Sequence, residues 1–212
     1  MLKVEKFVFN DFNENTYLIW DEDSKEAIVV DPGCITKSEQ IQFSEFVEKE
    51  NLTLKYLVST HCHLDHVFGN AFIKNRFSPE YLINEKESSL LDMLVEHAHK
   101  YGFEVEQSPL PDRFIDERTI LKLGENSIKI LFTPGHSPGE ICLLLEKEKI
   151  CITGDVLFKE GIGRTDLWGG DYFTLMDSIQ DILFKLPEET IILPGHGDSS
   201  TIEHEKNNNP FF

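Results

Sequence analysis

Residues of metal-binding type follow four separate apolar, strand-like runs of this chain. The first run, "LKYLVST", leads into the segment "HCHLDH" at residues 61–66. Three later runs lead into "TPGH", "ITGD" and "LPGH", which place His136, Asp155 and His196 at strand ends beside glycine. In layered α/β folds, ligand-binding side chains gather where strands end and loops begin. The sequence therefore predicts a fold in which four strand ends contribute to one site.

The order of the predicted elements indicates an α/β fold. Strand-like runs fill the two ends of the chain, and a helix-rich stretch covers roughly residues 67–118 between them. Within that stretch, residues 84–102 have the pattern of one long helix. A further helix is predicted later in the chain, over residues 171–186. No repeat or low-complexity linker interrupts the chain. We therefore expect residues 1–212 to form a single domain with two sheets and outer helices.

The charge and the apolar runs exclude several classes of partner. The net charge is −18, from 38 acidic and 20 basic residues, whereas a nucleic-acid surface needs clustered lysine and arginine. The longest apolar runs, such as "ICLLL", are too short to cross a membrane. The N-terminus lacks the apolar core of a secretory signal. We expect a cytoplasmic protein that binds neither nucleic acid nor membrane, with its oligomeric state open.

The segment at residues 61–66 carries the chemistry of a metal site. His61 and His63 are two residues apart, so they can converge on one ion if the backbone turns there. Asp65 and His66 can then point toward a second ion. Imidazole nitrogen and carboxylate oxygen are ligands for zinc and related divalent metals. An HxH pair alone would be a weak signal, but HxHxDH together with three further strand-end ligands predicts a metal site.

The other histidines lack this setting. His97 and His99 fall in the long predicted helix, and His204 falls in the C-terminal tail. A lone histidine is most often a solvated helical or loop residue. We therefore predict no ligand role for these three side chains.

The motifs HxHxDH, GH, GD and PGHG, spread over about residues 15–200, together resemble the metallo-β-lactamase fold superfamily. The resemblance implies a four-layered αβ/βα sandwich, with two mixed sheets, outer helices and a site at one edge of the sheets. It also implies that Asp31, in "DPG", supports the ligands from behind without binding metal. The implied ligands are His61, His63 and His136 for one ion, Asp65, His66 and His196 for a second, and Asp155 as a bridge.

Two segments are similar to the glyoxalase II group, the hydroxyacylglutathione hydrolases, and especially to its short bacterial relatives. They are "GDVLFKEGIGRTDLWGGD" at 154–171 and "PGHGDSSTIEHEKNNNPFF" at 194–212. The resemblance implies hydrolysis of a thioester, whose thiol has a pKa near ~8.5 and leaves with little help from an acid. Two divalent ions, zinc first with iron or manganese as alternatives, would hold a hydroxide that attacks the acyl carbonyl. Asp65 would orient that hydroxide.

The chain departs from this group at the substrate-binding end. Full-length members have a helical C-terminal domain that forms much of the glutathione pocket, and we expect that domain to be absent here. Arg164 and Asp166 stand where the group has a lysine and a tyrosine that contact glutathione. Arg164 is predicted to bind a substrate carboxylate through two hydrogen bonds. The alternative is that Arg164 and Asp166 pair with each other and only brace the loop.

A rival reading comes from a different class of enzyme. The segment "GRTD" is also similar to the persulfide dioxygenases, oxidoreductases of the same fold. They use one iron held by two histidines and an aspartate, which here would be His61 or its neighbour, His136 and Asp155. The histidine in "PGHG" completes a second metal and favours the hydrolase. A metal-binding module without activity is a third alternative, and a count of bound metal discriminates between the first two.

Overall fold

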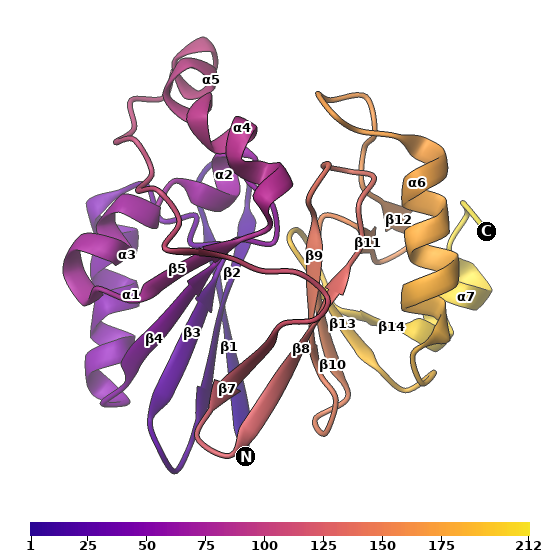
Figure 1. The fold of residues 1–212 in the computed structure, drawn as a ribbon, viewed down its shortest axis with the longest axis horizontal. Helices are drawn as coiled ribbons and strands as arrows, with labels where there is room; N and C mark the ends of the chain where they lie inside the picture. The colour runs from indigo at the N-terminus through magenta and orange to yellow at the C-terminus, as the bar shows by residue number, and fades with distance from the viewer. The chain divides into compact units, whose positions relative to one another are not determined.

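The computed structural model describes all 212 residues and contains two six-stranded sheets, each with helices packed on it (Figure 1). The chain separates into two compact units. The N-terminal unit consists of Met1–Ile83, Ser88–Phe114 and Lys122–Asn126. The C-terminal unit consists of Asn84–Glu87, Ile115–Leu121 and Ser127–Phe212. The expectation that residues 1–212 form a single domain stays a prediction.

The sheet of the N-terminal unit has the order β1-β2-β3-β4-β5-β6. Strands β1 to β3 are antiparallel neighbours, and β3 to β6 are parallel neighbours, so the sheet is mixed. Its strands are β1 (Leu2–Phe9), β2 (Glu14–Asp21), β3 (Glu26–Val30), β4 (Thr53–Val58), β5 (Glu80–Ile83) and β6 (Arg113–Phe114). Its helices are α1 (Lys37–Lys49), α2 (Leu64–Val67), α3 (Asn70–Phe77), α4 (Ser88–Asp92) and α5 (Leu94–Lys100).

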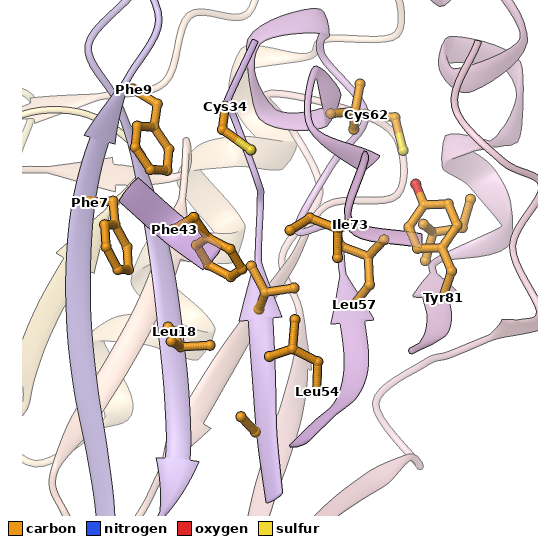
Figure 2. Packing of buried hydrophobic residues seen from close by; sticks show 14 of the residues in the cluster. Phe7, Phe9, Leu18, Cys34, Phe43, Leu54, Leu57, Cys62, Ile73 and Tyr81 are labelled. Atoms are coloured by element: carbon orange, nitrogen blue, oxygen red, sulfur yellow. The ribbon is translucent and has the colours of Figure 1, made fainter. Parts of the chain in front are cut away.

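Side chains of helices α1 and α3 pack against one face of this sheet, and Figure 2 labels Phe43 and Ile73 among the buried residues there. Helix α1 begins at Thr36, whose hydroxyl accepts a hydrogen bond from Glu39 N while the Glu39 carboxylate accepts from Thr36 N, a capping box. Phe43 of α1 is fully buried, and its ring lies 5.5 Å from that of Phe7 on β1. Ile73 of α3 joins the same core. The apolar spacing of α1 thus fixes which face of the helix meets the sheet.

The sheet of the C-terminal unit has the order β14-β13-β10-β9-β8-β7. Strand β10 is parallel to β13 and antiparallel to β9, so this sheet is also mixed. Its strands are β7 (Ile120–Leu123), β8 (Asn126–Phe132), β9 (Ile141–Leu145), β10 (Ile150–Gly154), β13 (Ile191–Pro194) and β14 (Ser200–Thr201). A separate hairpin pairs β11 (Leu157–Phe158) with β12 (Gly161–Ile162). The remaining elements are η1 (Glu85–Glu87), α6 (Tyr172–Asp177), η2 (Ser178–Ile182), η3 (Leu183–Lys185) and α7 (Ile202–Asn208).

Leu175 and Ile179, from α6 and its continuation η2, pack with strand residues such as Cys142 and Ile192. All four side chains are fully buried. The α/β class with two mixed sheets and helices is therefore confirmed. No helix in the structure has the length and apolarity needed to cross a membrane.

The structure differs from the sequence-based prediction in three details. The helix expected over 84–102 is divided into η1, α4 and α5. The first turn, η1, is anchored to residues 137–139, because the buried Glu87 carboxylate accepts hydrogen bonds from Ser137 Oγ and Gly139 N. The helix expected over 171–186 changes after Asp177 into a π turn and a 3₁₀ turn. His204, expected in a tail, lies in helix α7.

Replacing Phe43 with alanine should destabilise the protein by about 3–5 kcal/mol, because it leaves a cavity beneath helix α1. Ile41 lies on the same helix with 56% of its surface exposed, so Ile41→Ala should change stability by no more than about 0.5 kcal/mol. Urea denaturation of both variants measures the difference. A cost below about 1 kcal/mol for Phe43→Ala would show that this core relaxes around the loss.

Candidate metal centre

The N-terminal unit gathers the first group of predicted ligands after strand β4. His61 follows the strand end, and His63 is the N-cap of α2, whose single turn carries Asp65 and His66. The ring of His61 lies 4.1 Å from that of His66 and 4.8 Å from that of His63, measured between centroids. His61 and His66 are fully buried, and Asp65 is 8% exposed. Three imidazoles and one carboxylate are therefore concentrated in a site with little access to water.

Asp31, at the end of β3, determines which ring nitrogens these histidines present. Its carboxylate accepts hydrogen bonds from Thr60 N at 2.6 Å and from Thr60 Oγ1 at 2.5 Å, and lies 3.2 Å from His66 Nδ1. The Thr60 hydroxyl gives its proton to Asp31, so its oxygen accepts from His61 Nδ1 at 3.1 Å. Both histidines are thus protonated at Nδ1 and offer Nε2 as the ligand atom. These contacts place Asp31 beside the predicted ligands, and its role as a support that does not bind metal stays a prediction.

The separation of Asp65 and His66 fits a shared ion. Asp65 Oδ2 lies 3.7 Å from His66 Nε2, which is too long for a hydrogen bond. Two ligands that bind one tetrahedral ion at about 2.0–2.2 Å lie about 3.4 Å from each other. The pair is therefore spaced as two ligands of one metal ion.

The C-terminal unit holds the other three predicted ligands. His136 Nδ1 lies 2.7 Å from the carbonyl oxygen of Arg164. A carbonyl only accepts, so Nδ1 carries the proton and Nε2 is the ligand atom. Asp155 Oδ2 lies 3.6 Å from His136 Nε2 and also 3.6 Å from His196 Nε2. One carboxylate oxygen therefore has an imidazole on each of two sides at the spacing of shared ligands, the arrangement expected of a bridge.

Buried glutamates that the sequence analysis missed support these ligands. Glu140 Oε1 accepts a hydrogen bond from Asp155 N at 2.8 Å, and burial raises the pKa of Glu140 well above its usual value. Glu87 Oε1 accepts from Ser137 Oγ and Gly139 N, which directly follow His136 in its turn. In the sequence these two residues look like ordinary surface glutamates. Only the closeness of Glu140 to "GH" could have signalled its role.

A further buried carboxylate lies under the "DPG" turn of the N-terminal unit. Glu14 is fully buried, burial raises its pKa well above the usual value, and its Oε2 accepts from Thr16 Oγ1 at 2.9 Å. A Cβ on Gly33 would lie 2.1 Å from that oxygen and 2.8 Å from Asp65 O. Asn10 Nδ2 donates to both Gly33 O and Asp65 O. The glycine therefore allows the turn to lie directly against the segment that carries Asp65.

Arg164 and Asp166 form an ion pair with two hydrogen bonds, of 2.7 and 2.8 Å. Both side chains are exposed, and the hydrogen bonds from Arg164 lower the pKa of Asp166 to about 2. The pairing that the sequence left open is therefore present. A role for Arg164 in binding substrate stays a prediction.

The sequence model of the metallo-beta-lactamase superfamily matches residues 9–196 of this chain. The chain belongs to the metallo-beta-lactamase superfamily. It is 42% identical to hydroxyacylglutathione hydrolase GloC of Haemophilus influenzae, over 99% of this chain and 98% of the relative. Relatives of this kind support a metal-dependent hydrolase.

Solved structures of the superfamily share the fold. BLEG-1 B3 metallo-beta-lactamase superposes with a TM-score of 0.90 at 32% identity, over 99% of both chains. TTHA1623 in a di-iron-bound form gives 0.87 at 28% identity, covering 98% of this chain and 100% of that one. ETHE1 from Myxococcus xanthus superposes with a TM-score of 0.80 at 26% identity, covering 98% of this chain and 83% of that one. The predicted fold family is confirmed, and divalent metal is indicated, while zinc stays a prediction.

Asp31→Asn should weaken metal binding about 10–100-fold, because the amide can no longer accept from both Thr60 and the His66 ring. Asp21→Asn is the matched control, since Asp21 is also a buried carboxylate at a strand end and accepts from Ser24 N and Asn126 Nδ2. Titration of the metal-stripped variants with Zn²⁺ measures both affinities. Equal affinities for the two variants would contradict the role of Asp31.

Proposed function

We propose that this protein is a dinuclear-metal hydrolase of thioesters. The observation that carries the proposal is the single Asp155 oxygen at 3.6 Å from both His136 Nε2 and His196 Nε2. In the proposed site two ions would share Asp155 as a ligand. His61, His63 and His136 would hold one ion, and Asp65, His66 and His196 would hold the other.

Divalent ions bound in this set would lower the pKa of a water molecule and polarise the acyl carbonyl. The chain contributes the orientation of its ligands, because Asp31, Thr60 and the Arg164 carbonyl fix the Nδ1 protons of three histidines. Asp65 is the proposed catalytic residue. Its carboxylate can accept a proton from the attacking water and orient the oxygen of that water toward the acyl carbonyl. The departing thiolate needs no strong acid, since a thiol has a pKa near ~8.5.

One relative and one ion pair support the proposed substrate class. A relative that shares 42% of its residues is named a hydroxyacylglutathione hydrolase, which supports a thioester of a small thiol. In this chain Arg164 already holds Asp166. Asp166 occupies the Nε–Nη2 edge of the guanidinium and offsets its charge. A substrate carboxylate therefore has to compete with Asp166 for Arg164, and this competition weakens selection for glutathione.

The second candidate is a mononuclear-iron persulfide dioxygenase, which the segment "GRTD" favours. It would need only two histidines and Asp155 as protein ligands. The two proposals therefore differ in what His196 does.

His196→Ala should remove one of two bound ions and lower kcat for thioester hydrolysis on the order of 10²–10³-fold, the scale for losing a main electrostatic element. The control is His99→Ala, an exposed histidine on α5, which should keep both ions and full activity. Metal analysis and thioesterase assays on the same preparations measure both effects. Full hydrolysis by His196→Ala would contradict the dinuclear site. One iron per chain with oxygen consumed on glutathione persulfide would establish the dioxygenase instead.

The enzyme should cleave S-lactoylglutathione and a shorter acyl thioester without the γ-glutamyl end with kcat/KM values within about tenfold, or ~1.4 kcal/mol. Asp166→Asn should lower KM for the glutathione thioester several-fold, because it releases Arg164, and should leave the shorter thioester unchanged. Steady-state kinetics on both substrates make the test. A preference for the glutathione thioester of about 1000-fold or more in the unaltered protein would contradict weak selection.

A further inference from the structure

Helix α7 of the C-terminal unit carries a fully buried carboxylate that the proposed chemistry does not use. Glu205 Oε2 accepts hydrogen bonds from Glu160 N and from Asn209 Nδ2, both at 2.8 Å, and its Oε1 accepts from Ser200 Oγ. A buried carboxylate is tolerated only when hydrogen bonds replace the water that it loses. The donors are Glu160 in the β11–β12 turn, Ser200 on β14, and Asn209 at the end of α7 itself, so Glu205 joins two other segments to its own helix.

The first of these segments is the β11–β12 hairpin, which follows the bridging Asp155. Its turn contains Glu160 with φ +56°, a left-handed conformation that is uncommon outside glycine. Helix α7 and the residue after it hold this turn at three points. Besides the bond from Glu160 N to Glu205, His204 Nε2 lies 2.9 Å from Glu160 Oε1, and Asn209 Nδ2 donates to Gly161 O at 3.1 Å. These contacts from helix α7 and Asn209 stabilise the uncommon conformation of the turn.

The second segment carries His196. Ser200, which bonds Glu205, lies four residues after His196. The hairpin also touches the imidazole directly, because the Phe158 ring lies 6.3 Å from the His196 ring at an angle of 64°. The His196 side chain is 28% exposed, whereas that of His136 is 3% exposed. His196 is therefore the less enclosed of the two imidazoles around Asp155, and the Phe158 ring packs against it edge to face.

We infer that Glu205 is a positioning residue for the second metal ion, through the β11–β12 hairpin and Phe158. The inference rests on the proposed function, since it needs His196 to be a ligand. Glu205 holds the turn, the turn holds Phe158 against the imidazole, and the imidazole presents Nε2 toward Asp155. Loss of the carboxylate frees the turn and lets the His196 ring leave its binding orientation. Two of the three ligands proposed for the other ion, His61 and His63, lie on the N-terminal unit and have no such link to Glu205, so that ion should be retained.

The test is calorimetric titration of the metal-stripped full chain with Zn²⁺, comparing Glu205→Gln with Glu203→Gln. Glu203 is an exposed glutamate on the same helix. Glu205→Gln should weaken one of two binding steps about 10–100-fold, the scale for losing an outer hydrogen-bond partner of a ligand. Glu203→Gln should leave both steps unchanged. Thioesterase activity of Glu205→Gln should return toward the unaltered level when zinc is raised in proportion.

Phe158→Leu keeps the test decisive if Glu205→Gln does not fold. It should weaken the same single step, because it removes the ring that contacts His196. Unchanged affinities in both variants, or equal weakening of both steps, would overturn the inference. If the unaltered protein binds only one ion, the proposed function fails. If it binds two ions and both variants bind like it, only the role of Glu205 fails.

Discussion

The proposed metal site depends on hydrogen bonds at the Nδ1 atoms of its histidines. A neutral imidazole can bind metal through only one nitrogen, and the partner of the other nitrogen decides which one it is. Asp31 accepts from Nδ1 of His66 directly. It acts on Nδ1 of His61 through the Thr60 hydroxyl, so that Nε2 of both rings is left to bind metal. The carbonyl of Arg164 accepts from Nδ1 of His136 in the same way. In both units, a predicted ligand ring is therefore oriented by hydrogen bonds from its own part of the chain.

Buried glutamates extend this support at a cost in stability. Glu140 holds the backbone of Asp155, and Glu87 holds the turn that carries His136. Burial raises the pKa of Glu140 and of Glu14 well above the usual value, so their charged forms are disfavoured. Such groups contribute little net stability, but removing a partner leaves an unsatisfied polar atom. Their value in this protein is the fixed placement of ligand-bearing turns.

The sequence predicted those parts of the site that have a local signal. HxHxDH and the three strand-end ligands stand beside apolar runs and glycines, so their pattern is visible in one dimension. The sequence gives no comparable signal for Glu87, Glu140 and Glu205, because only tertiary contacts distinguish a buried glutamate from a surface one. The division of the helix predicted over 84–102 has the same cause, since the Glu87 carboxylate bonds to residues 50 and 52 positions away.

The most direct test of the dinuclear account is a crystal structure of the metal-loaded protein, with anomalous diffraction measured at the metal absorption edge. The account predicts two peaks that share Asp155, one ligated by His61, His63 and His136 and the other by Asp65, His66 and His196. A single fully occupied peak in protein saturated with metal, with His196 outside its coordination sphere, would contradict it.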